Sequence, residues 1–306
     1  MYKELPTIDR TLVGDNPFIG VDHLSRARAR DRATGLDPDR IIEVLDSAFA
    51  TGAQGLSFST HPMMYRVLRR MKETSYPRPF GAYPLVPYAQ EYVRLANEKG
   101  SIGLAAEVLS KLSWKGKART LAGAGLSLFS IDPIRILNLY VDAELEIVMN
   151  SLPARATLKS ILLHEIITDL ACSLDAAPLI QAYIDHVLKR YEVRPGFVTR
   201  NFAKFLAFTK RNQIDLDKIL IVTPFNKVGF QMNPSREACE RALEQADERI
   251  HIVAMSILAA GYLGLNDALE YLSRFSKIRS YVVGVSTRAH AEQTFSQMKR
   301  SIEVAI

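Results

Sequence analysis

Short apolar runs alternate with amphipathic segments along most of this chain. The runs are rich in β-branched residues and almost uniformly apolar, as in "ILIVTPF" and "YVVGVST". Strands of this kind are buried on both faces, which a parallel sheet covered by helices requires. We predict strands within residues 11–20, 55–60, 80–88, 160–166, 196–200, 219–225, 251–257 and 281–287.

The amphipathic segments carry helix start and stop signals. Asp37 precedes Pro38 as an N-cap, and Gly52 follows the end of the same helix. "MMYRVLRRMKE" predicts the next helix, and later helices are predicted at 178–191, 201–212, 234–245, 266–275 and 289–301. Eight strand–helix units predict a (β/α)8 TIM barrel in a single domain over residues 1–306. Two three-layer domains are the alternative, but no Pro/Gly/Ser-rich linker separates two halves.

One segment is about twice as long as a barrel helix needs. Residues 91–150 contain "SIGLAAEVLSKLS", the Gly-rich "LAGAGLSLFS" and a long helix that begins at Asp132–Pro133. We interpret the segment as a helical insertion before the fourth strand, and an additional strand at 102–106 is the alternative. It could form a lid over the site or the surface of a homo-oligomer, and the sequence does not choose.

The amino-acid composition indicates a soluble globular protein. The 306 residues are 48% hydrophobic and 24% charged, which is typical of a soluble globular protein. Cys172 and Cys239 form neither a metal-ligand spacing nor a disulfide framework. No signal-peptide pattern opens the chain, and the longest apolar run, about 121–131, is too short to span a bilayer. These features predict a cytoplasmic protein without a membrane partner.

The net charge of +6 is a mild excess, from 39 basic against 33 acidic residues. It is compatible with an anionic ligand and does not favour nucleic acid as a partner. The basic residues concentrate at "SRARARDR", residues 25–32, which is either a solvated loop or an anion clamp beside a site.

In a barrel of this type, active sites lie at the carboxyl ends of the strands. The polar residues that close the strands are Asp15, Asn16, His23, Ser57, Ser59, His61, His164, Glu165, Thr199, Arg200, Asn201, Thr223, Asn226, Lys227, Ser256, Ser286, Thr287 and Arg288. Structural roles compete with functional ones: His61 could cap a helix, His164 could be a satisfied core histidine, and Asn226–Lys227 could be a plain turn. In a regular strand, Glu165 would face away from the side that His164 occupies.

The turn at Ser286 and Thr287 opens a helix, whose first N–H groups are unpaired and carry a partial positive charge. We predict an anion site there, with a plain N-cap as the alternative. A metal site from Asp15, His61 and His164 is disfavoured because no ligand pair shares one element at a known spacing. The chain has no Gly-x-Ser-x-Gly elbow, GxGxxG loop or Walker loop.

The later motifs resemble the aldo-keto reductase superfamily in a shared order. "VVGVSTRAHAEQT" resembles its eighth strand and following helix, and "IVAMSILAAGYL" resembles its seventh strand. "VTPFNKVGFQMNPSREACERAL", "RPGFVTRNFAKFL" and "SILLHEI" resemble its sixth, fifth and fourth strands. The resemblance covers residues 150–302 well and the first 65 residues loosely.

The resemblance implies a nicotinamide cofactor, NADP, and a site to hold it. The implied cofactor-binding residues are Asn201, Asn226, Ser256, Gly284, Ser286, Thr287 and Arg288. His164 stands where the family has its active-site histidine, and His61, Tyr65 and Lys227 are the other catalytic candidates.

The catalytic pattern of the family is incomplete in this chain. Ser59 stands where the family has an Asp, Tyr65 is displaced by one residue from the proton-donating Tyr, and the third strand carries no Lys. A phenol with a pKa near 10 needs a neighbouring cation to act as an acid at neutral pH, and Lys227 is the candidate cation. Arg200 interrupts the Ser–Asn pair of the nicotinamide site, and Thr294 stands where the family often has Asn.

Three hypotheses follow. The first is an aldo-keto-reductase-like barrel that binds a phosphate-bearing or carbonyl small molecule, with NAD(P)H-dependent reduction as its activity. The second is a lyase, isomerase or hydrolase on an anionic substrate that Arg26, Arg28 and Arg30 recruit. The third is an inactive barrel used as an interaction scaffold.

Overall fold

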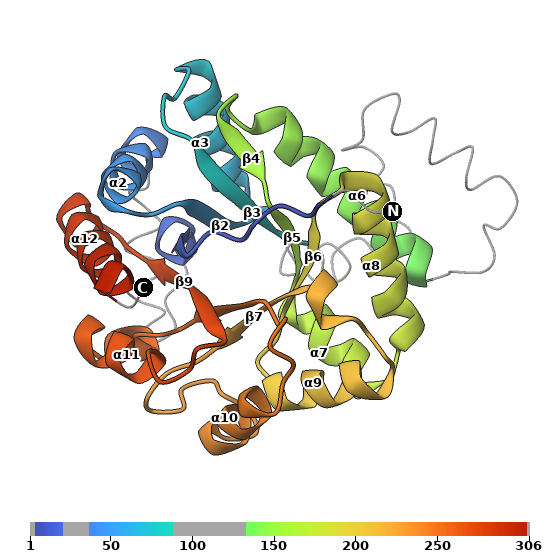
Figure 1. Cartoon of the computed structure of the whole chain (residues 1–306). Coiled ribbons are helices and arrows are strands. Elements are labelled where there is room, and N and C mark those ends of the chain that lie inside the picture. The colour runs from blue at the N-terminus through green and yellow to red at the C-terminus, as the bar shows by residue number, and fades with distance from the viewer. Residues whose placement is uncertain (1–3, 21–36, 88–132, 305–306) are drawn as a thin grey trace, which may run out of the picture.

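In the described part of the computed structural model, nine parallel strands and a ring of helices form a closed barrel (Figure 1). The structure describes residues 4–20, 37–87 and 133–304. The strands are β1 (Thr11–Gly14), β2 (Gly55–Ser59), β3 (Phe80–Val86), β4 (Ala156–Leu158), β5 (Ser160–Leu163), β6 (Arg194–Val198), β7 (Leu220–Pro224), β8 (Ile252–Met255) and β9 (Ile278–Gly284).

Helices follow most of the strands. The α-helices are α2 (Pro38–Thr51), α3 (Pro62–Glu73), α6 (Pro133–Ser151), α7 (Glu165–Ser173), α8 (Ala177–Tyr191), α9 (Phe202–Arg211), α10 (Arg236–Glu244), α11 (Leu265–Leu272) and α12 (Arg288–Val304). However, β4 leads to β5 without a helix, and α7 precedes the predicted helix α8. Three short 3-10 helices are η1 (Asn16–Phe18), η2 (Leu216–Lys218) and η3 (Ala259–Gly261). Among the described residues, no helix combines the length and the apolar character that a membrane span needs.

Strand pairing closes the sheet on itself. β1 pairs with β2 on one side and with β9 on the other, with Val13 opposite Leu56 and Val283. β3 pairs with β4 along its first half and with β5 along its second half, so β4 and β5 share one position in the barrel. The nine strands therefore fill eight positions, and the predicted (β/α)8 barrel is confirmed.

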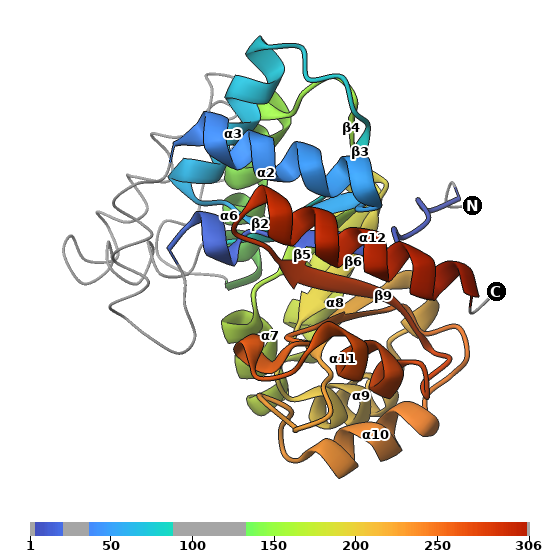
Figure 2. The ribbon, with the colours of Figure 1, turned by 90° about the vertical axis from the view of Figure 1, so that its left-hand side faces the viewer.

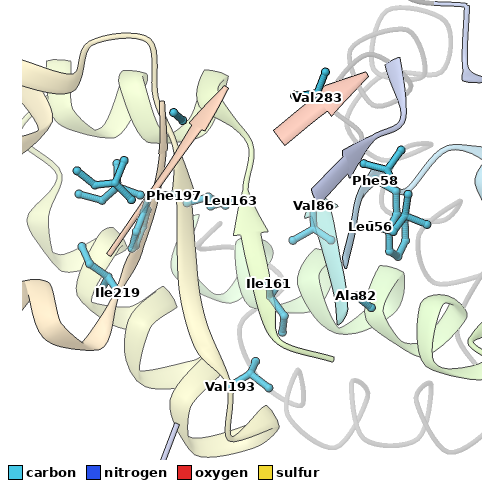
Figure 3. Close-up of a cluster of buried hydrophobic side chains, with 14 of the residues drawn as sticks. Leu56, Phe58, Ala82, Val86, Ile161, Leu163, Val193, Phe197, Ile219 and Val283 are labelled. Atoms are coloured by element: carbon cyan, nitrogen blue, oxygen red, sulfur yellow. The ribbon is translucent and has the colours of Figure 1, made fainter. Parts of the chain in front are cut away.

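Alternation along the strands separates two layers of core. Leu56 and Phe58 of β2 are fully buried against the surrounding helices, as are Ile161 and Leu163 of β5 (Figure 3). The residues between them point to the barrel interior. The interior cluster consists of Leu12, Tyr83, Leu162, Val198, Leu220, Val222 and Val253. Six of these seven residues are aliphatic, and the seventh is Tyr83 of β3.

The segment predicted as an insertion divides into two parts. Its second part, α6, packs against β3, α3 and α8, and it is the helix between β3 and β5 in the ring (Figure 1). The first part, residues 91–132 with the alternative strand at 102–106, lies outside the described residues. The basic segment 25–32, with Arg26, Arg28 and Arg30, and His23 also lie outside them.

The N-terminal segment lies at the amino end of the barrel, on the right in Figure 2. Asp9 donates its N–H to the Tyr83 hydroxyl oxygen (2.8 Å), and that hydroxyl donates to Asp9 Oδ2 (2.9 Å). A Cβ at Gly81 would stand 1.8 Å from Asp9 Oδ2, and one at Gly55 would stand 3.0 Å from it. Because both residues are glycines, the Asp9 carboxylate can lie against β2 and β3 at the amino end of the barrel.

Candidate functional site

A cavity of about 880 Å³ opens at the carboxyl ends of the strands. Leu85, Leu162, Val198, Val222 and Met255 form an apolar floor that continues the interior cluster. Above this floor, the polar and charged residues of the lining are Asp15, Asn16, Ser57, Ser59, His164, Glu165, Asp169, Arg200, Gln231, Ser256, Ser286 and His290. The cavity thus has the apolar body and the few convergent polar groups of a small-molecule site.

Asp15 is the most deeply buried carboxyl group of this cavity. It follows β1 directly, its residue is 6% exposed, and its Oδ2 accepts the Ser59 N–H at 2.7 Å. Burial raises the pKa of Asp15 to about 6, against the smaller opposing effect of the bonds from Ser59. A carboxyl group in this state exchanges its proton near neutral pH, as general acids and bases do.

His164 lines the cavity as the N-cap of α7. Its Nδ1 accepts the Ile166 N–H (3.2 Å), so in the neutral ring the proton is on Nε2. Burial lowers the pKa of His164; neighbouring Glu165 opposes this shift and Arg200 adds to it. His164 is therefore a neutral hydrogen-bond donor at pH 7.

Glu165 corrects an expectation drawn from the sequence. The predicted strand 160–166 ends at Leu163, because the His164 cap starts α7 at the next residue. His164 and Glu165 therefore line the same cavity instead of facing opposite sides. Glu165 Oε1 accepts a hydrogen bond from Arg200 Nη2 at 2.9 Å, and the Arg200 Nε is buried without a hydrogen-bond partner.

Asp169, one helical turn further along α7, fixes the loop after β6. Its carboxylate accepts hydrogen bonds from the Thr199 hydroxyl, the Arg200 N–H (3.3 Å) and the Asn201 side-chain amide (3.0 Å). These bonds join groups that lie about thirty positions apart in the chain. They orient Arg200 at the rim, and they use the amide of Asn201 that the resemblance assigned to a cofactor.

The loop after β8 has an unusual backbone. Ser256, Ala259 and Ala260 have φ of 53°, 47° and 58°, in the left-handed region that costs roughly 1–2 kcal/mol for residues other than glycine. The Ala259 N–H bonds the Ser256 carbonyl (2.9 Å), which keeps this loop folded along the cavity wall. Strain of this kind is concentrated at functional sites.

The start of α12 forms another part of the wall. Gly284, Ser286 and His290 line the cavity. A Cβ at Gly284 would stand 3.0 Å from Pro17, so β9 can approach the β1 loop only through a glycine. Thr287 accepts the His290 N–H (3.2 Å) as a cap, and Arg288 extends to Glu43 (3.9 Å) on the outer surface.

Several predicted residues lie away from the cavity. His61 caps α3 by accepting the Met63 N–H at 3.1 Å, and Tyr65 packs against the outer core. Asn226 is fully buried, and its amide bonds both the N–H and the carbonyl of Phe230. Lys227 is half-exposed and faces Asp267 at 3.5 Å. None of these four is among the described residues that line the cavity.

From the sequence, Asp15 is a strand-end residue without an assigned catalytic role. Asp169, Gln231 and His290 line the cavity but were not predicted as site residues. Glu165 and Asp169 are one turn apart on α7, and this spacing was the available signal for a shared face. Nothing local indicates that Arg200 would be their partner.

No family model matches the chain, and no curated protein is significantly similar to it. Among solved structures, the "putative aldo-keto reductase" from Pseudomonas aeruginosa superposes with a TM-score of 0.56 at 13% identity, over 99% of this chain and 96% of that one. The glycerol dehydrogenase from Gluconobacter oxydans superposes with a TM-score of 0.52 at 11% identity, over 99% and 94%. The chain shares the barrel fold of these two proteins. At these identities the likeness concerns the fold, because one barrel supports many chemistries.

The residues of the cavity fit only part of a nicotinamide cofactor. Ser256, Gly284 and Ser286 line the wall beside the first turn of α12, where a phosphate group would find backbone N–H donors. Asn201 and Asn226 are engaged elsewhere, and Thr287 and Arg288 are not among the lining residues. No tyrosine or lysine is among the described lining residues. The wall therefore fits an anion, and within residues 4–20, 37–87 and 133–304 no lining residue matches the tyrosine that donates the proton in the reductases.

Proposed function

We propose that this protein is an enzyme that transfers protons on a small anionic metabolite without redox chemistry, as an isomerase, lyase or hydrolase does. The observation that supports it is the buried Asp15 carboxyl, which faces the cavity with a pKa of about 6. Among the described lining residues, no phenol or amine competes for the role of proton carrier.

The proposed mechanism assigns each polar group of the cavity one task. Ionised Asp15 takes a proton from the substrate and returns it in a later step. The Nε2–H of His164 donates a hydrogen bond to the substrate oxygen that gains negative charge. Arg200, held by Glu165 and Asp169, and the start of α12 at Ser286 orient the anionic group of the substrate.

Reduction with NADPH or NADH is the second candidate function. Its supporting observation is the position of Gly284 and Ser286, which open onto the same cavity as His164. In this case the proton would come from Asp15 or His164 and not from a tyrosine.

A thermal-melt titration distinguishes the two. The wild-type protein and Ser286→Trp are titrated in parallel with phosphate, a set of phosphorylated and carboxylated metabolites, NADPH and NADH. The tryptophan side chain would occupy the part of the cavity next to α12. A ligand at about a hundredfold excess over its Kd stabilises the native state by roughly 2.7 kcal/mol. We expect anionic metabolites to raise the Tm by several degrees in the wild type only.

The control is Ser273→Trp, on the exposed end of α11 and away from the cavity, which leaves every ligand effect in place. A Tm increase with NADPH well beyond that with phosphate would support the reductase instead. If no ligand raises the Tm, or if Ser286→Trp retains the increase, the proposed use of this cavity fails.

A further inference from the structure

A second cavity, of about 550 Å³, lies at the opposite end of the barrel from the site described above. The amino ends of β6, β8 and β9, together with η2 and the N-terminal segment, form its walls. In Figure 2 this is the right-hand end, where the N-terminal segment and the last turns of α12 lie. None of its lining residues belongs to the carboxyl-end cavity.

The charge of this second cavity is strongly one-sided. Its cationic lining residues are Arg10, Arg194, Lys218, Lys277 and Arg279, with His251 beside them, and its acidic lining residues are Glu4 and Asp217. Much of the remaining wall is apolar, from residues such as Ile8, Leu188 and Ile250. A cavity with this lining suits an organic anion, with its charge on the arginines and its body on the apolar wall.

Arg194 is the residue whose placement calls for an anion. It is 8% exposed, one Nη donates to the Asp217 carbonyl, and its Nε is buried without a hydrogen-bond partner. The ion pairs of this region belong to other cations: Lys218 with Asp215, Lys277 with Glu248 and His251 with Asp217. Burial lowers the pKa of Arg194, and the carboxylates of Asp217 and Asp215 oppose this shift only from beyond ion-pair distance. Among the described residues no acceptor reaches its Nε, and a buried donor without an acceptor is unfavourable.

His251 experiences the field of these cations. Burial lowers the pKa of His251, and Arg194 and Arg279 lower it further, while Asp217 at 3.4 Å from Nε2 opposes them. These three charged groups come from β6, β9 and η2, the elements that surround the imidazole. An anion bound beside them would offset the arginines, so His251 is a local reporter for binding.

We propose that the amino-end cavity is a binding site for a phosphorylated small molecule, in which the guanidinium groups of Arg194 and Arg279 hold the phosphate. Guanidinium offers forked N–H donors that match phosphate oxygens, and Arg194 Nε is such a donor without an acceptor. Because the site joins the N-terminal segment to three strands, an occupied site ties this segment to the barrel.

The first test uses inorganic phosphate as the probe and His251 as the reporter. Proton NMR titrations of the histidine rings are recorded in phosphate and in chloride at equal ionic strength, and His251→Asn identifies the resonance among the six histidines. We expect phosphate to raise the pKa of His251 by roughly half a unit or more. Identical midpoints in the two salts would overturn the proposal.

The second test compares two exposed arginines. Arg279→Gln and Arg249→Gln remove the same charge, but only Arg279 lines the cavity, and Arg249 is paired with Asp247. We expect Arg279→Gln to weaken the phosphate effect on His251 about tenfold and Arg249→Gln to leave it unchanged. Equal losses would show a diffuse charge effect and contradict a defined site.

Arg194→Gln is measured in the same way once its folding has been checked, because Arg194 is buried and also bonds the Asp217 carbonyl. We expect it to weaken the phosphate effect on His251 as well. Asp15→Asn tests this proposal independently of the proposed function, because Asp15 lines only the carboxyl-end cavity. If His251 responds to phosphate in Asp15→Asn as in the wild type, the second site stands whatever the carboxyl-end cavity does.

Discussion

An aspartate lies beside each end of β1: Asp9, two residues before the strand, is half-buried, and Asp15, directly after it, is 6% exposed. At the amino end, Asp9 exchanges two hydrogen bonds with Tyr83, and burial raises its pKa against the opposing effects of Tyr83 and Lys159. At the carboxyl end, Asp15 is held by Ser59 and faces a cavity. The same residue type is bound to a tyrosine hydroxyl at one end and lines a cavity at the other.

The difference lies in what surrounds each carboxylate. Asp9 Oδ2 occupies the space that side chains at Gly81 and Gly55 would fill, so its environment is closed. Ser57, Ser59 and Ser256 leave the space above Asp15 open. We therefore expect an acid to react with a substrate at the carboxyl end, where it lines a cavity, and not at Asp9.

The largest effect is expected from Asp15→Asn. The amide oxygen still accepts the Ser59 N–H, but the group no longer carries a proton. For any substrate found by the ligand titration, turnover should fall by about 10²- to 10⁴-fold while the ligand-induced Tm increase persists. Turnover assays of Asp15→Asn and Asp9→Asn check this, with Asp9→Asn retaining activity. Full turnover in Asp15→Asn would contradict the assignment.

The pH dependence of stability should separate the two aspartates next. The pKa of Asp15 is about 6 in the native state against 3.8 as its ordinary value, so the native state binds more protons between those values. The contribution of Asp15 to the free energy of unfolding is therefore greatest below pH 3.8. As the pH rises to 6, roughly 3 kcal/mol of this contribution is lost. Denaturant unfolding of wild type and Asp15→Asn between pH 4 and 7 measures it. A pH-independent difference between the two would exclude the raised pKa.

Gly81→Ala should destabilise the amino end of the barrel. The new Cβ would stand 1.8 Å from Asp9 Oδ2 and 2.9 Å from the Lys159 side chain. Such overpacking costs about 1–3 kcal/mol, measured as the free energy of unfolding. Gly264→Ala is the matched control, because its nearest neighbour would be 3.7 Å away. Equal stability of the two variants would show that Asp9 is not locked over Gly81.

Ala260→Gly should have the smallest effect, in the opposite direction. Its φ of 58° favours glycine, so the substitution relieves strain in the loop along the cavity and stabilises the fold by about 1 kcal/mol. Thermal unfolding measures the stability of Ala260→Gly. Its affinity for ligand is measured separately. A loop whose strain organises the site should bind ligand more weakly once relaxed. A destabilised Ala260→Gly would contradict the strained backbone.

The fold was predictable because its signals are local. Asp37 caps α2 and Gly52 ends it with φ of 134°, as the sequence predicts. The apolar runs give the strands, and their order gives the barrel. The end of β5 was not predictable in this way, because the chain stays apolar at 166–167 and the capping role of His164 overrides the pattern.

The site was predictable only in part, since its groups meet through long-range contacts. The pairing of Glu165 with Arg200 depends on how α7 lies beside the loop after β6. Lys227 was a reasonable candidate from its position after β7, but Asn226 clamps that turn onto Phe230 and Lys227 faces Asp267 outside. Side-chain direction within a loop is set by such clamps and not by spacing.

The most direct test of the account is the titration of the Asp15 carboxyl group itself. Carbon-13 NMR of aspartate carboxyl carbons, with Asp15→Asn to identify the resonance, gives its midpoint. We predict a midpoint near pH 6, which shifts when an anionic ligand enters the cavity. A midpoint at or below the ordinary 3.8, unaffected by any ligand, would contradict the acid–base role assigned to this end of the barrel.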